Sequence, residues 1–327
     1  MFRNLARFIC TFINLFYLLL FDNFHIPLYT LCIMKLEYTN VESSGYTTVF
    51  NVLKNEFHLS DRLILKLKKE KQIYINGTPT HVRKEIASGD IITVDISFTE
   101  ESENIVPTKM DLDILYEDDC FLIINKGANT PVHPSINHFE DTLSNGVKYY
   151  FENIGLKRKI RPVNRLDKDT SGIVIFAKNE YIQECLTHQM KAGIFNKEYL
   201  ALVTGTLEES PLTLVKNIKR KTESIIERCV SDDEDSEYAE TIFETIKEYD
   251  GYSLIKCILK TGRTHQIRVH TSYLGHSILG DTLYGKASDL ISRQALHAYK
   301  VRFIHPVTKE MIEITCDLPE DMKKLLT

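Results

Sequence analysis

The tightest limit on how this 327-residue chain can fold comes from residues 161–176, RPVNRLDKDTSGIVIF. The last five of these residues form a short apolar and β-branched run, which is typical of a strand buried on both faces. The residues ahead of the run are mostly polar or charged, and Gly172 permits a close turn into the strand. The pattern therefore predicts a polar loop that a rigid strand holds at the mouth of a cleft.

This polar loop has two interpretations. In the first, Arg165 and Asp167 form a surface ion pair and Thr170-Ser171 is a turn. In the second, the loop belongs to an active site, because residues 164–172, NRLDKDTSG, resemble the signature loop of the RluA type of pseudouridine synthase, His-Arg-Leu-Asp-x-x-Thr-Ser-Gly. Asn164 stands where most members of that family carry histidine, so the departure lies beside the aspartate rather than at it.

Length, net charge and cysteine content indicate the number of domains, the kind of partner and the cellular compartment of the protein. The length suggests two or three domains, and a net charge of -5 means that any RNA-binding surface must be local. The sequence has no CxxC pair and no His/Cys cluster at metal-ligand spacing, so we expect reduced thiols, no metal site and a cytoplasmic protein. The seven cysteines are Cys10, Cys32, Cys120, Cys185, Cys229, Cys257 and Cys316.

Residues 1–33 differ in character from the rest of the chain. Residues 5–21 are strongly apolar and follow two arginines, as in a signal peptide or a marginal transmembrane helix. Polar residues interrupt the run from Asp22 onward, and no small-residue cleavage site follows. Our hypothesis is that Met34 is the natural start and that residues 1–33 are an upstream extension or a disordered tail, with membrane anchoring as the alternative.

Residues 47–96 have the pattern of a small separate module. Apolar residues at helical spacing predict two short helices, with Ser60 as the N-cap of the second. A hairpin follows, with Asn76-Gly77 as its turn and residues 91–94 as its closing strand. The second helix is basic, which is typical either of a solvated face or of an RNA-contacting face. Its cationic residues are Arg62, Lys66, Lys68, Lys69 and Lys71.

The order of residues in this module resembles the S-four type of RNA-binding domain. The matching segments are residues 59–62, 75–77 and 88–91, with Ser88 in place of the customary proline. The resemblance implies that the module contacts the phosphates of an A-form RNA stem through Arg62, Lys66, Lys68 and Lys69. Residues 97–109 are acidic and polar, as in a linker between domains.

We expect residues 110–327 to form the large catalytic domain. Residues 112–126 predict a hairpin, residues 142–151 and 179–190 predict helices, and Asp250-Gly251 predicts a turn between two long strands. The predicted class is α+β, with a large mixed, mainly antiparallel sheet, flanking helices and a central cleft. Residues 211–237 are rich in lysine and then strongly acidic, and we expect the acidic run 231–237 to be a solvated, mobile loop without a partner.

Residues 261–270, TGRTHQIRVH, form a third motif at the change from a strand to a helix. Two arginines and two histidines at a helix N-terminus favour anions, as in any protein that grips phosphate. Together with residues 275–285 and 296–306, however, the motif resembles the second hallmark of the same synthase family and its closing strand. Tyr199, in the run KEYLALV, is either a core tyrosine or, as the resemblance implies, part of the catalytic pocket.

The resemblance implies the isomerisation of uridine to pseudouridine in ribosomal RNA of the large subunit or in transfer RNA, by a monomer that uses no cofactor and no metal. Asp167 would be the nucleophile or base, kept ionised by a bidentate pair with Arg268. Arg165 would fill the gap left by the flipped base, and Tyr199 would stack on that base or transfer a proton. Arg263 and His265 would contact phosphates or shape the loop.

Two other classes of protein fit parts of the pattern. One is a non-catalytic RNA-binding protein, which would have no use for a recessed aspartate paired with arginine. The other is a hydrolytic glycosidase, which would need a second carboxylate, and Asp169 is the close candidate.

Overall fold

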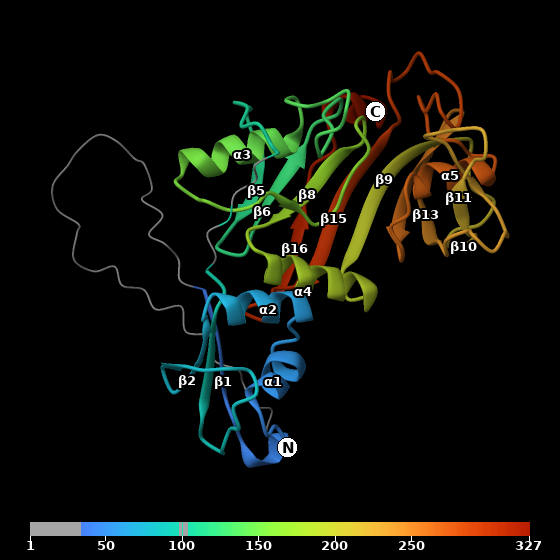
Figure 1. Ribbon diagram of the computed structural model, residues 1–327. Coiled ribbons are helices and arrows are strands. Elements are labelled where there is room, and N and C mark those ends of the chain that lie inside the picture. The colour runs from blue at the N-terminus through green and yellow to red at the C-terminus, as the bar shows by residue number, and fades with distance from the viewer. Residues whose placement is uncertain (1–33, 98–99, 101–103) are drawn as a thin grey trace.

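The computed structural model describes residues 34–97, 100 and 104–327, which form a small N-terminal domain and a large domain (Figure 1). The hypothesis about residues 1–33 lies outside the described residues. Among the described residues, no helix combines the length and apolar character that crossing a membrane requires.

The small domain is a four-stranded antiparallel sheet with helices against it. Its strands run in the order β1-β4-β2-β3, with β1 at Lys35–Thr39, β2 at Ile73–Ile75, β3 at Thr78–Pro79 and β4 at Ile91–Asp95. The helical segments are α1 (Val49–Asn51), continued by one π-helical turn (Val52–Glu56), and α2 (Asp61–Lys69). The amide of Leu63 donates to Ser60 Oγ at 3.2 Å, so Ser60 is the predicted N-cap.

Two features of this domain differ from the sequence interpretation. Strand β1 begins the sheet before residue 47, because Leu36 and Tyr38 alternate inward and complete the hydrophobic core. The turn at Asn76-Gly77 leads into the short β3, and the predicted closing strand β4 pairs with the other edge of β2.

The large domain is built on a ten-stranded sheet in which every pair but one is antiparallel. The path is β10-β13-β14-β9-β15-β8-β6-β5, with β16 beside β15 and β7 beside β8; only β15 and β8 run parallel. These strands are β5 (Ile114–Glu117), β6 (Phe121–Lys126), β7 (Arg161–Pro162), β8 (Ser171–Ala177), β9 (Asn196–Thr204), β10 (Leu212–Val215), β13 (Glu240–Tyr249), β14 (Tyr252–Leu259), β15 (Leu296–Ile304) and β16 (Met311–Thr315). The predicted α+β class with a mainly antiparallel sheet is confirmed.

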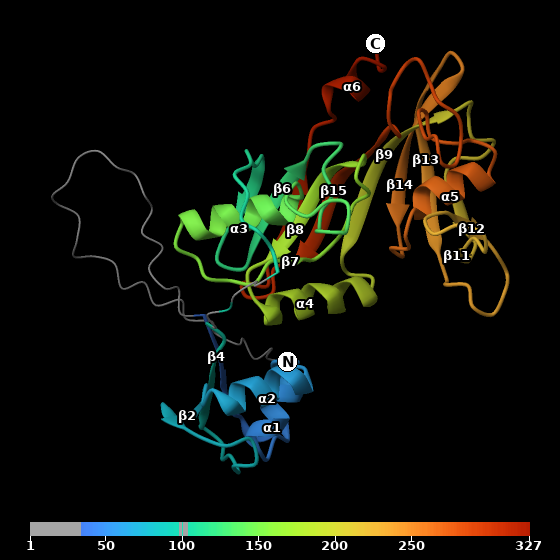
Figure 2. The ribbon, with the colours of Figure 1, turned by 45° about the horizontal axis from the view of Figure 1, so that its top comes forward.

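Helices cover both faces of this sheet, which explains the apolar run in β8. Figure 2 shows α3 (Leu143–Asn153) over β6 and β8, and α5 (Gln266–Tyr273) beside β13 and β14, whereas α4 (Glu180–Lys191) lies between the sheet and the small domain. Val174 and Phe176 pack in the cluster that includes α3, and Ile173 and Ile175 pack in the cluster that includes α4. The expectation of a strand buried on both faces is therefore correct. The short α6 (Glu320–Lys323) lies near the C-terminus.

Polar contacts join the small domain to α4 and to the segment before the large domain. Ser60 Oγ donates to Glu184 Oε1 at 2.6 Å, and Arg62 Nε lies 3.3 Å from Glu180 Oε1. Lys66 Nζ lies 2.6 Å from Glu100 Oε1, and Glu100 also pairs with Arg161. The basic helix α2 thus has one side turned toward carboxylates of its own chain.

A short hairpin precedes the acidic run 231–237, which was predicted to be a solvated loop. Strands β11 (Ile218–Arg220) and β12 (Arg228–Val230) pair with each other, and the following acidic residues form ion pairs with lysines of this region. The acidic side chains remain largely exposed, as expected of a solvated loop, and the preceding basic residues fold back beside them.

Candidate active site

The loop between β7 and β8 is fixed at both of its ends. At the first end, Asn164 pairs with the strand backbone: its Nδ2 donates to Ile173 O and its Oδ1 accepts from Ile175 N, both at 2.9 Å. At the other end, Gly172 has a φ of +112° where β8 passes β15. A Cβ there would lie 2.3 Å from the carbonyl oxygen of Ala298, so only glycine fits. These contacts at both ends of the loop hold Asp167, which lies between them, in one place.

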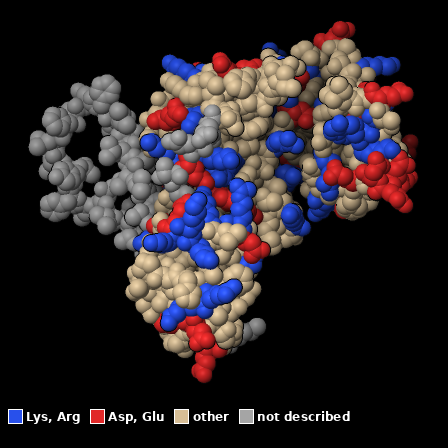
Figure 3. Space-filling model, viewed as in Figure 1, with Lys and Arg blue, Asp and Glu red and all other residues tan. Residues whose placement is uncertain are grey.

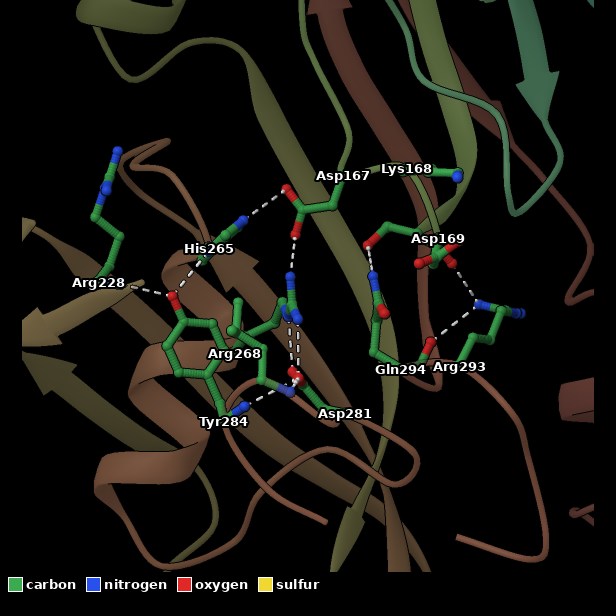
Figure 4. A network of polar contacts seen from close by, with 12 residues as sticks. Asp167, Lys168, Asp169, Arg228, His265, Arg268, Asp281, Tyr284, Arg293 and Gln294 are labelled. Carbon is green, nitrogen blue, oxygen red and sulfur yellow. Dashed lines mark hydrogen bonds and ion pairs between the residues drawn. The ribbon is translucent and has the colours of Figure 1, made fainter. Parts of the chain in front are cut away.

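Side chains from two other segments hold the middle of this loop. The buried Lys126 donates from Nζ to the carbonyl oxygens of Gly127 (2.8 Å) and Lys168 (2.9 Å). Arg293 Nη1 donates to the Asp169 carbonyl at 3.0 Å, and Gln294 donates to Thr170 Oγ1 at 3.2 Å (Figure 4). Burial lowers the pKa of Lys126 to about 7, although the nearby carboxylates oppose the shift.

Arg268, from the first turns of α5, reaches the aspartate of this loop. Its Nη1 donates to Asp167 Oδ2 at 3.0 Å, while its Nε and Nη2 donate to the two oxygens of Asp281 at 2.7 and 2.8 Å (Figure 4). The expected pairing of Arg268 with Asp167 is present, but the expected bidentate geometry is wrong for that pair. It belongs to Asp281, because two of the three donor positions of the guanidinium already face that buried carboxylate. Burial opposes the charge on Arg268, but the two carboxylates outweigh it and raise its pKa.

His265 completes this group in a strained backbone conformation. It is the N-cap of α5 with φ 58° and ψ 19°, the left-handed region that residues with a Cβ seldom occupy. Its Nδ1 lies 2.8 Å from the hydroxyl of Tyr284, which accepts from the amide of Arg228, and its Nε2 lies 3.7 Å from Asp167 Oδ1. Because that hydroxyl can donate its proton to Nδ1, the N–H of the neutral ring is on Nε2 and faces the aspartate. Burial lowers the pKa of His265 against the pull of Asp167.

A cavity of about 70 Å³ opens at this group. Tyr199, on β9, lines it and is buried, and burial followed by the charge of Asp167 raises the pKa of its phenol well above the usual value. The other lining residues include Arg165, Asp167, Arg263, His265, Arg268 and Leu296. The predicted central cleft thus lies where β8, β9, β14, β15 and α5 meet.

Comparison with known proteins places this arrangement in a family. The sequence model of RNA pseudouridylate synthase matches residues 120–273. The uncharacterized RNA pseudouridine synthase YjbO of Bacillus subtilis is 38% identical over 83% of this chain and 95% of its own length. The chain belongs to the RNA pseudouridylate synthase family. It is therefore an isomerase that modifies RNA, as the three motifs implied.

Two further relatives of this synthase agree with that assignment. The ribosomal large subunit pseudouridine synthase D of Blochmanniella floridana is 31% identical over 90% of this chain and 98% of its own length. Among solved structures, human RNA pseudouridylate synthase domain containing 1 is 29% identical, covers 63% of this chain and 83% of its own, and has a TM-score of 0.53.

The other candidate residues of the synthase lie at different distances from the cavity. Arg165 is exposed at its mouth, and Arg263 donates to Glu237 Oε1 at 3.0 Å and to the Tyr238 carbonyl at 2.9 Å. The four basic residues of α2 are in the small domain, outside the cavity lining. Of these, Arg62, Lys68 and Lys69 are exposed and Lys66 is half-buried.

Sequence reasoning missed residues that hold Arg268, His265 and the loop of Asp167 in place. Asp281 and Tyr284 lie in the segment GDTLYG, which carried the family resemblance but to which no role was assigned. Lys126 was predicted only as the last residue of the hairpin 112–126. The sequence signal was present in each case, but the partners are more than ten residues away and only the fold identifies them.

One other cluster among the described residues has metal-ligand types: Asp118, Cys120 and His305. The Asp118 carboxylate accepts from Tyr116, from the amides of Cys120 and Phe121, and lies 2.9 Å from His305 Nε2. Burial raises the pKa of the Cys120 thiol well above its usual value, which disfavours the thiolate that a metal would need. The cluster fits a structural hydrogen-bond network better than a metal site.

Proposed function

We propose that this protein converts uridines of large-subunit ribosomal RNA to pseudouridines and that Asp167 is the catalytic carboxylate. The observation that carries the proposal is the position of that carboxylate, at a cavity and within hydrogen-bond distance of the buried cation of Arg268. The choice of RNA follows from relatives that are named ribosomal large subunit pseudouridine synthases.

The reaction needs a group that is ionised beside the sugar and base. The C1′–N1 bond of uridine breaks, a C1′–C5 bond forms, C5 loses its proton and N1 gains one, so the isomerisation is balanced without an external group. Asp167 acts as nucleophile or base, and the guanidinium of Arg268 orients it through a hydrogen bond at 3.0 Å. Tyr199 supplies a flat face for the base and a hydroxyl that stays protonated, because its pKa is raised.

The uridine must leave its helix to reach Asp167, because a stacked base is inaccessible. Arg165 is exposed at the mouth of the cavity, and its long side chain fills the space that the extruded base leaves. Residues 47–96 are the RNA-gripping domain of S-four type, and the exposed Lys68 and Lys69 contact phosphates. Residues 97–109 are the linker between this domain and residues 110–327.

The test compares two neighbouring carboxylates in the same loop. Asp167→Asn is expected to abolish pseudouridine formation in an unmodified transcript of large-subunit ribosomal RNA while RNA binding is retained. Asp169→Asn is the matched control and is expected to keep turnover. Turnover by Asp167→Asn would overturn the assignment of the catalyst, and release of free uracil would indicate a glycosidase instead.

The target is found by mapping pseudouridines in total RNA from cells that lack the gene. A missing site in large-subunit ribosomal RNA is the expected result. A missing site only in transfer RNA would overturn the proposed substrate class but not the chemistry.

A further inference from the structure

A second hollow with a different character adjoins the catalytic cavity. It has a volume of about 200 Å³ and shares Arg263 with the catalytic cavity. Cations from the hairpin β11–β12 line it, and two carboxylates lie among them. The charged lining residues are Lys219, Arg220, Arg228, Asp235, Glu237 and Arg263.

The cations of this hairpin are arranged as a site for an anion. Arg220 and Arg228 are directly opposite each other in the β11–β12 ladder, so two positive charges are cross-strand neighbours. Such a pair is unfavourable unless negative charge lies close to it. The hairpin is also joined to the catalytic group, because the amide of Arg228 donates to the hydroxyl of Tyr284, which contacts His265.

The negative charge comes from the same chain. We call residues 231–237 the acidic strap. Lys219 is hydrogen-bonded to Asp233 and lies 3.9 Å from Asp235, Lys216 lies 4.0 Å from Asp232, and Glu237 pairs with Arg263 at 3.0 Å. Figure 3 shows acidic and basic side chains gathered side by side on this part of the surface.

The numbers of basic and acidic residues show how the acidic strap changes the local net charge. Residues 216–237 contain five basic and seven acidic residues, so with the strap in place this region is net negative beside a site for RNA. Without the strap the same surface would be strongly positive.

The middle of the acidic strap can move away from the hairpin while both of its ends stay attached. The amide of Ser231 donates to Asn217 O at 3.0 Å, and Glu237 and Ile218 exchange backbone hydrogen bonds at 2.9 Å, so both ends are fixed to the hairpin. Between these ends, the side chains of Asp232, Asp233 and Asp235 are 86, 61 and 78% exposed. Exposed ion pairs of this kind contribute little to stability, so an incoming anion can replace them at small cost.

We propose that the acidic strap occupies, in place of RNA, a phosphate-binding surface formed by Lys216, Lys219, Arg220, Arg228 and Arg263, and that the RNA substrate displaces it. The inference rests on the proposed function, because it takes RNA as the substrate of the adjoining cavity. RNA backbone phosphates match the cations in charge and replace the carboxylates one for one. The strap then discriminates between RNAs, since only an RNA with enough further contacts displaces it.

The test neutralises the strap and compares it with a variant of equal charge. The strap variant is Asp232→Asn, Asp233→Asn and Asp235→Asn; the control is Glu208→Gln, Glu209→Gln and Asp250→Asn, three exposed acids at the opposite end of strand β13. The probes are a labelled oligouridine and a labelled RNA hairpin, each measured over a series of salt concentrations with the full chain.

The strap variant is expected to bind both probes more tightly than the wild type, by about threefold to tenfold, and with a salt slope steeper by about 0.7 for each cation released to a single strand. Its KM for transcribed ribosomal RNA is expected to fall. The control is expected to match the wild type. Lys219→Ala should cost more affinity in the strap variant than in the wild type, because the lysine is then no longer occupied by Asp233.

Equal changes in the strap and control variants would overturn the inference, as would an equal cost of Lys219→Ala in both backgrounds. These outcomes are separate from the proposed function, which fails if the wild type forms no pseudouridine in any cellular RNA.

Discussion

Arg268 joins Asp167 to Asp281: its guanidinium donates one hydrogen bond to the first carboxylate, at 3.0 Å, and two to the second, at 2.7 and 2.8 Å. Asp281 is almost fully buried and also accepts hydrogen bonds from the amides of Leu283 and Tyr284, so its carboxylate is held in one position. Asp281 therefore fixes the cation, which contacts Oδ2 of Asp167, while Oδ1 lies 3.7 Å from His265 Nε2. If Asp167 is the catalytic carboxylate, as proposed, Asp281 is a positioning residue for it.

This arrangement predicts that Asp281→Asn lowers kcat much more than it changes KM. We expect a loss of about 100-fold in kcat, since a preorganised charge is no longer aimed at the site. Removing one member of the buried pair also lowers the free energy of unfolding by about 3 kcal/mol or more. Steady-state kinetics on transcribed RNA and urea denaturation measure the two effects.

Arg268→Lys is the comparison for that experiment, because lysine keeps the charge but cannot donate to both carboxylates in fixed geometry. It is expected to lose kcat as Asp281→Asn does. Full kcat in Asp281→Asn would mean that Asp167 does not depend on how the arginine is held.

Gly172→Ala is expected to prevent folding or to cost at least about 3 kcal/mol of unfolding free energy, because the new methyl group would overlap the backbone of Ala298. Gly155→Ala is the matched control: it also has a positive φ, +72°, but nothing lies within 4 Å of its Cβ position. That change should cost only about 1 to 2 kcal/mol for the left-handed backbone. Urea denaturation compares the two, and equal costs would show that the close approach of β8 and β15 is not required.

His297 predicts a specific pH dependence of stability. It is buried, its Nε2 donates to the Cys316 carbonyl at 3.2 Å, its Nδ1 accepts from Ser171 Oγ at 2.9 Å, and burial lowers its pKa to about 4. Between pH 6.5 and 4, His297 is protonated in the unfolded chain but stays neutral in the folded chain. Stability is therefore fully present above pH 6.5 and falls by about 3 kcal/mol as the pH drops to 4.

Urea denaturation at several pH values measures this dependence. His297→Gln is expected to be less stable at neutral pH but to lose less stability between pH 6.5 and 4 than the wild type. His81→Gln, at an exposed position, is the control and should keep the wild-type slope. An unchanged slope in His297→Gln would assign the acid sensitivity to other groups.

Local sequence patterns were enough for the main elements of the fold. The buried run in β8, the N-cap Ser60 and the turn at Asp250-Gly251 each depend on neighbours a few residues away, and each is present in the structure. Strand β1 was missed because it is short and follows an apolar stretch of different character, so its alternation over five residues gave little signal.

The site was predicted in part for the same reason. Asp167 and Arg268 lie in motifs with a recognisable order, so their pairing could be expected from the sequence. The role of Asp281 could not, because which carboxylate receives the bidentate pair depends on how α5 meets the loop after it. Likewise the ion pairs of the acidic strap could not be predicted, since nothing in its own composition indicates that Lys219 lies beside it.

The basic residues of α2 differ in what surrounds them, and this predicts which of them bind RNA. Lys66 is half-buried and pairs with Glu100, and Arg62 lies 3.3 Å from Glu180 although its side chain is 83% exposed. Lys68 and Lys69 are exposed. Lys68→Ala with Lys69→Ala is expected to lower RNA affinity and to reduce the salt slope by about 0.7 to 0.9 for each phosphate that is no longer neutralised, with kcat retained. Lys66→Ala should change both quantities less, because its half-buried side chain is already paired with Glu100 at 2.6 Å. Filter binding over a salt series measures the slope. The control of equal charge is Lys109→Ala with Lys324→Ala, which changes two exposed lysines outside the small domain. If that control weakens binding as much as the α2 variant does, general charge rather than a surface of the small domain attracts the RNA.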